Sequence, residues 1–256
     1  MARKTTAQRL GLAKQSRRKA ADQQAGPWMQ FQRYAIFYTP PEGALADFGA
    51  AWLGWDIATG MPVAHPYMQD VTDDIAALTE APRKYGLHGT IKPPFRLTDV
   101  QSEEALLAAF TELCMVSKPV SLDGLEVTRL GRFLALTVTG DTSELGALAA
   151  NFLRKLDGFR AFPTEAEVAK RQKTRLTLSQ EANLQNWGYP YALDDFRFHM
   201  TLTGKLPVEH AETLKQSLTQ VLVNTLPKPF VISSLTLVGE NTDGRFMEIK
   251  RQALQG

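Results

Sequence analysis

The feature that most constrains the fold is a duplication of three short motifs in the same order. The first copy reads HGT at 88–90, KP at 118–119 and GRF at 131–133, and the second reads HMT at 199–201, KP at 228–229 and GRF at 244–246. The proline follows the histidine by 31 residues in the first copy and by 30 in the second. Three motifs at matched spacing predict that the two halves of the chain fold alike.

Each copy predicts a strand with the histidine, then a helix, a short strand and a hairpin that returns at the glycine. The expected strands include 33–38, 85–92 and 195–203, and the expected helices include 44–53, 71–78, 102–116, 143–156, two within 165–187, and 207–223. This order predicts an α+β protein of two similar lobes, with two antiparallel sheets and helices on their outer faces around a central cleft. The expected domains are 29–140, which holds the first His-x-Thr motif, and 141–256, which holds the second.

The first 28 residues differ from the rest of the chain in charge. They carry seven basic residues and one acid, Asp22, which gives +6 in a chain whose total is +2. An arm that contacts RNA or a membrane would have this composition, but a disordered, solvated tail is the simpler interpretation. Cys114 is the single cysteine and no apolar run is long enough to span a membrane, so a cytoplasmic protein is expected.

The strand around the second histidine has two distinct faces. Phe198 and Met200 alternate with Arg197, His199 and Thr201, and Thr203 continues the polar series. Because successive side chains of a strand point to opposite faces, the cationic, imidazole and hydroxyl groups share one face. The same period places His88, Thr90 and Lys92 on one face of the first strand.

These two rows suit in-line displacement at a phosphodiester. The reaction needs a base on the attacking oxygen and an acid on the leaving oxygen, and imidazole serves either role near neutral pH. His88 and His199 are therefore the catalytic candidates, and Thr90 and Thr201 would donate hydroxyls to the phosphoryl oxygens.

Other residues complete the expected site. Substrate-binding roles are expected for three side chains: Lys92, Arg197 and Thr203. No metal or cofactor is expected, because the chain has neither a cluster of metal-ligating residues around the histidines nor a phosphate-binding or dinucleotide-binding loop. His65 and His210 are expected at the surface.

Two His-x-Thr motifs on strands of duplicated lobes resemble the two-histidine phosphoesterase superfamily, which includes RNA 2′,3′-cyclic phosphodiesterases. Longer segments are similar to a family of uncharacterised proteins associated with phosphonate-metabolism operons: RYAI at 33–36, AWLGWD at 51–56, YGLHGTIKPPFRL at 85–97, WGYPY at 187–191 and FRFHMTLTG at 196–204. The likeness covers about residues 31–252. Gly89 stands where the resemblance leads us to expect alanine, a small change that should leave the strand face undisturbed.

The resemblance implies a metal-independent hydrolase. It implies catalytic roles for His88, Thr90, His199 and Thr201, and by analogy His199 would activate water while His88 protonates the leaving oxygen. The candidate substrate is a phosphorylated ribose with a 1,2-cyclic phosphate. Two alternatives remain: an RNA 2′,3′-cyclic phosphodiesterase or RNA-end enzyme, and a non-catalytic module that binds a nucleotide or sugar phosphate. The expected partner is a small phosphodiester, RNA is less favoured, no membrane is involved, and the sequence leaves the oligomeric state open.

Overall fold

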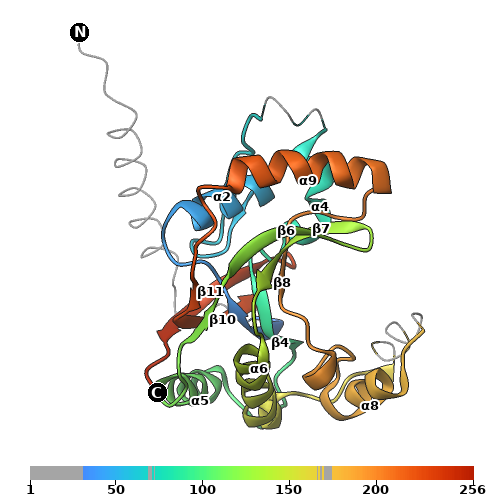
Figure 1. Ribbon diagram of the computed structural model, residues 1–256. Coiled ribbons are helices and arrows are strands. Elements are labelled where there is room, and N and C mark those ends of the chain that lie inside the picture. Colours follow the sequence, from blue (N-terminus) through green and yellow to red (C-terminus); the bar gives the residue numbers. More distant parts are fainter. Residues whose placement is uncertain (1–30, 69–70, 72, 166, 168, 170–174) are drawn as a thin grey trace.

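The computed structural model describes residues 31–256 except 69–70, 72, 166, 168 and 170–174, so the basic segment 1–28 lies outside it. The described chain is an α+β structure built around one curved antiparallel sheet (Figure 1). This agrees with the expected α+β class, and the two expected sheets meet as one continuous sheet. No helix in the described ranges is both long and apolar enough to cross a membrane.

The main sheet has seven strands in the order β11-β10-β1-β4-β8-β7-β6. In that order they span Phe246–Ala253, Ser234–Glu240, Arg33–Tyr38, Gly89–Phe95, His199–Thr201, Phe133–Thr139 and Gly124–Leu130. Two small sheets pair β2 (Trp55–Asp56) with β3 (Met61–Pro62) and β5 (Val120–Leu122) with β9 (Phe230–Ile232). The main sheet therefore places the two histidine strands side by side at its centre.

The strand order is consistent with a twofold relation about the junction between β4 and β8. On one side the order outward is β4, β1, β10, followed by β11 at the edge, and on the other it is β8, β7, β6. The two sides meet through the antiparallel pair Gly89 and Met200. The hairpin strands are exchanged, since β6 and β7 adjoin the second histidine strand while β10 adjoins β1. The boundary expected at residue 140 thus divides the sequence, whereas each side of the sheet takes strands from both halves.

Four helices cover one face of this sheet: α2 (Ala44–Leu53), α5 (Glu103–Met115), α6 (Ser143–Lys155) and α9 (Val208–Leu222). Their apolar stripes explain the packing; in α9, Leu214, Leu218 and Leu222 recur every four residues and are buried. Figure 1 shows α9 alongside β6 and β7, and α5 and α6 at the opposite end of the sheet. Helix α6 also borders the site described below, through Ala149, Ala150 and Leu153.

Several expected boundaries differ from the observed ones. The strand expected at 85–92 begins at Gly89 and runs through Pro93 and Pro94 to Phe95. Prolines are tolerated there because β4 pairs with β8 only at Gly89, so that edge of β4 needs no further amide donors. The strand expected at 195–203 is shortened to His199–Thr201, and a 3₁₀ turn, η2, occupies Leu193–Asp195.

The shorter helices also differ in part from expectation. The segment expected as 71–78 forms α3 (Ile75–Leu78) and is followed by α4 (Glu80–Arg83). The expected capping box at Thr177 and Gln180 is confirmed and opens α8 (Leu178–Trp187). The helix expected after Thr164 falls largely on residues outside the described ranges. A second 3₁₀ turn, η1, spans Asp157–Phe159.

Candidate active site

The register at the β4–β8 junction brings the two His-x-Thr motifs together. Because Gly89 pairs with Met200 in antiparallel fashion, Thr90 stands opposite His199, and Thr201 stands opposite His88. Directly opposed residues have Cβ atoms about 4.5–5.5 Å apart, and diagonal neighbours such as the two histidines are about 7–8 Å apart. Two imidazoles and two hydroxyls therefore line one face within the reach of a single phosphate.

The two histidines are oriented by the same type of hydrogen bond. Nδ1 of His88 lies 2.9 Å from the carbonyl oxygen of Gly86, and Nδ1 of His199 lies 2.8 Å from that of Arg197. A carbonyl only accepts, so each Nδ1 carries the proton and donates it, which leaves Nε2 for the substrate. Each ring is thus held by the backbone two residues earlier, in keeping with the duplicated motif.

The surroundings of His88 shield its ring from water. The imidazole is half-buried and stacks on Phe37 with ring centroids 3.9 Å apart, and Tyr85 lies at 5.6 Å. Burial lowers the pKa of His88 to about 4, with a further decrease from His199 and a partial compensation by the Gly86 carbonyl. His88 is consequently a neutral imidazole at physiological pH.

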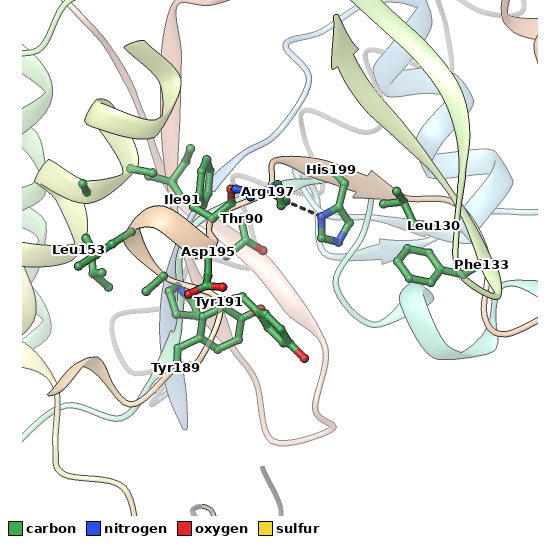
Figure 2. Close-up of a pocket in the computed structure, with 16 residues that line it drawn as sticks. Thr90, Ile91, Leu130, Phe133, Leu153, Tyr189, Tyr191, Asp195, Arg197 and His199 are labelled. Carbon is green, nitrogen blue, oxygen red and sulfur yellow. Dashed lines mark hydrogen bonds between the residues drawn. The ribbon is translucent and has the colours of Figure 1, made fainter. Parts of the chain in front are cut away.

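The motifs open into two adjoining cavities of about 500 and 430 Å³. The larger contains His199 and the smaller contains His88, while four residues line both: Thr90, Pro93, Phe133 and Tyr189. Figure 2 shows the larger cavity, with His199 between Thr90 and Phe133 and with Tyr189 and Tyr191 along another wall. We refer to the two cavities as the His199 cavity and the His88 cavity.

The structure places two of the expected substrate-binding residues, Arg197 and Thr203, at different cavities, and each already has polar partners. Arg197 lines the His199 cavity, although its Nη1 donates to the carbonyls of Asp194 and Phe196. Thr203 lines the His88 cavity, but its hydroxyl donates to the Gly204 carbonyl and accepts from the Leu134 amide.

The expectation for Lys92 is wrong, because the structure places its side chain away from both cavities. The pairing with β1 shifts between Thr90 and Lys92, and this irregularity breaks the alternation of side chains along β4. Lys92 is buried, donates to the Leu153 carbonyl at 3.1 Å and lies 3.5 Å from an Asp157 carboxylate oxygen. Burial lowers the pKa of Lys92 to about 8, and Asp157 partly offsets this.

The expectation for Gly89 is wrong as well. A Cβ added there would overlap Cε2 and Cζ of Phe198, a side chain that is itself buried. Alanine therefore does not fit at this position unless the Phe198 ring moves.

Several cavity residues were not expected from the sequence. Tyr189 and Tyr191 pack edge to face, 5.7 Å apart, and lie in the WGYPY segment, whose only signal was its family likeness. Phe133 belongs to the repeated GRF motif, which could have indicated a role at the site. Arg33 and Lys205 line the His88 cavity; the only signal for Arg33 was the family likeness of the RYAI segment, and no motif pointed to Lys205.

The other two histidines lie outside both cavities. Nδ1 of His65 contacts the Trp52 carbonyl, and Nε2 of His210 contacts Asp73 at 3.2 Å. In the part of the chain that the structure describes, no group of three or more His, Cys, Asp or Glu residues could hold a metal ion.

Comparisons with known proteins place this geometry in context. Residues 90–247, more than half of the chain, match the family model described as "Protein of unknown function (DUF1045)". Two curated relatives carry the name "Ribose 1,5-bisphosphate phosphokinase PhnN". The protein of Janthinobacterium sp. (strain Marseille) is 37% identical over 88% of this chain and 51% of its own length. The protein of Laribacter hongkongensis (strain HLHK9) is 33% identical over 68% of this chain and 40% of its own length. The chain spans about half the length, or less, of these relatives.

Solved structures offer more distant matches. One described as "Crystal structure of phosphoesterase" has a TM-score of 0.41 at 15% identity, with 88% of this chain and 99% of that chain covered. E. coli LigT complexed with 3′-AMP has a TM-score of 0.41 at 16% identity, with 89% and 100% covered.

Proposed function

The chain belongs to the DUF1045 family, and from that premise we propose that it is a metal-independent phosphodiesterase acting through His88 and His199. The observation that carries this proposal is the register of β4 and β8. It sets each histidine opposite the threonine of the other motif, on the face that opens into both cavities. A binding module would not require two imidazoles with the same backbone anchor and with Nε2 left for a ligand.

The different surroundings of the two rings support a division of roles. His88 is neutral because burial lowers its pKa to about 4, so its Nε2 can accept a proton from water. The water oxygen attacks phosphorus, its proton passes to Nε2 of His88, and the bond to the leaving oxygen breaks. His199 enters this step protonated at both ring nitrogens and gives the leaving oxygen its Nε2 proton. This assignment reverses the one suggested by analogy from the sequence. The hydroxyls of Thr90 and Thr201 would stabilise charge on the non-bridging oxygens.

The candidate substrate is a ribose phosphate with a 1,2-cyclic phosphodiester. Cleavage of the bond to the 2-oxygen would leave a 1-phosphate, so a 5-phosphorylated substrate would give ribose 1,5-bisphosphate. That compound forms part of the name that both curated relatives carry. This chain has no phosphate-binding loop of the Gly-rich Lys-Ser/Thr type. We therefore do not propose for it the phosphokinase activity in the name of those longer proteins.

One observation favours a second candidate, an enzyme for 2′,3′-cyclic phosphates at RNA ends. The His199 cavity has aromatic walls from Phe133, Tyr189 and Tyr191, on which a nucleobase could stack. Turnover of a panel of ribose cyclic phosphates, nucleoside 2′,3′-cyclic phosphates and short RNAs tests both candidates. Hydrolysis of none of them, by protein that is folded, would refute the phosphodiesterase proposal.

A further inference from the structure

The His88 cavity has an uneven charge. Its lining includes two side-chain cations, Arg33 and Lys205, as well as the neutral His88, and it includes no aspartate or glutamate among the described residues. The lining of the His199 cavity includes Asp195 as well as Arg197, so this cavity holds a carboxylate in addition to a cation. An anionic group on the substrate, beyond the reacting phosphodiester, is therefore attracted to the His88 side.

Arg33 is held rigidly at this cavity. Its guanidinium makes two hydrogen bonds to the Glu240 carboxylate, from Nε to Oε2 and from Nη2 to Oε1, the latter at 2.6 Å. The same group lies 5.8 Å from the centre of the Phe246 ring. Glu240 raises the pKa of Arg33, with burial opposing it, so the cation persists throughout the working pH range. Because Glu240 already balances much of this charge, Arg33 serves mainly as an oriented donor.

Lys205 supplies charge that is not balanced in this way. The neighbouring backbone is fixed on both sides, since the Gly204 amide donates to the Leu78 carbonyl at 2.7 Å and the Leu206 amide donates to the Arg132 carbonyl at 2.6 Å. The lysine side chain is exposed at the cavity wall, and no ion pair joins it to any residue within the described ranges. The loop thus attaches Lys205 at a fixed point on the wall of the cavity that contains His88.

We propose that Arg33 and Lys205 form a subsite for a second phosphate, so that the substrate is a cyclic phosphodiester which also carries a phosphomonoester. This inference rests on the proposed function and extends it to the class of substrate. Lys92 cannot serve here because it is buried against Asp157, and Arg197 lines the other cavity. Charge-assisted hydrogen bonds from a guanidinium and an ammonium suit a phosphate dianion.

The test compares two substrates that differ by one group: ribose 1,2-cyclic phosphate with and without a 5-phosphate. The wild type is expected to prefer the 5-phosphorylated compound in kcat/KM, and Lys205→Ala is expected to reduce that preference about 10–100-fold. Arg33→Lys keeps the charge but loses the paired donors, and it should reduce the preference less than Lys205→Ala does. Lys118→Ala removes an exposed lysine that lines neither cavity and should keep the wild-type preference.

A binding measurement separates this inference from the proposed function. Ribose 5-phosphate is titrated into wild type and Lys205→Ala by calorimetry, and binding about tenfold weaker or more is expected in the variant. If neither cyclic substrate is hydrolysed but ribose 5-phosphate binding depends on Lys205, the proposed function fails and the subsite stands. If Lys205→Ala leaves both the substrate preference and ribose 5-phosphate binding unchanged, the subsite is refuted.

Discussion

Substitution of Gly89 by alanine tests the contact on which the site depends. The added methyl group would overlap two ring atoms of Phe198 and would lie 3.1 Å from a third, Cδ2. Phe198 is 6% exposed, so the ring has little room in which to retreat. Inserting a methyl group into a packed core typically costs about 1–3 kcal/mol, and we expect Gly89→Ala to lower the free energy of unfolding by that amount. Activity should fall with it, because displacement at Gly89 moves His88 and Thr90 relative to β8.

Urea unfolding of wild type and the variants measures this effect. Gly146→Ala is the matched control, since a Cβ at this position of α6 would meet nothing within 4 Å, and alanine should stabilise the helix by about 0.5–1 kcal/mol. Phe198→Leu combined with Gly89→Ala should recover part of the loss, giving a coupling of about 1 kcal/mol or more in the double-mutant cycle. Equal stability of Gly89→Ala and wild type, with unchanged activity, would refute the packing of β4 against Phe198.

Four further outcomes follow from the structure. His88→Ala and His199→Ala should each reduce turnover of a cyclic phosphodiester at least about a hundredfold without unfolding the protein. Activity should also survive EDTA; a loss of activity with the chelator that zinc restores would contradict the metal-independent mechanism. With a substrate that has no second titrating phosphate, kcat/KM should hold down to about pH 4, the pKa of His88; an acid limb near pH 6.5 would contradict the assignment of the base. Between pH 8 and about 10.4 the unfolded chain binds more protons at Lys92 than the folded chain does. The free energy of unfolding of the wild type should therefore rise with pH relative to that of Lys92→Met, and parallel curves for the two proteins would contradict the lowered pKa of Lys92.

The internal repeat made the centre of the site predictable. Spacing alone identified the two His-x-Thr motifs, and the two-residue period of a strand put each threonine on the face of its histidine. The structure adds the pairing of Gly89 with Met200, which turns two separate motifs into one four-residue arrangement. Local pattern was sufficient here because each motif is short and the symmetry supplies the long-range part.

The cationic residues were not predictable in the same way. Lys92 has the correct spacing from His88, but a shift in the pairing of β4 with β1 turns it toward α6, and no local sequence signal marks that shift. Arg33 lies 55 residues before His88 and reaches the cavity only because β1 pairs with β4. Its orientation depends on Glu240, which is brought alongside by the exchange of β10 into the first side of the sheet. Such contacts depend on sheet topology, which residue periodicity does not determine.

The symmetry of the motifs means that their spacing alone cannot distinguish one histidine from the other, and the folded chain gives the two imidazoles different surroundings. Both imidazoles have the same anchor, a carbonyl two residues earlier. Phe37 stacks closely on His88, whereas the ring that contacts His199 is Phe133, tilted at 5.9 Å. The closer aromatic cover belongs to the histidine whose pKa is lowered to about 4. A duplicated chain thus gives two copies of one motif different chemical environments, through the neighbours that the repeat does not share.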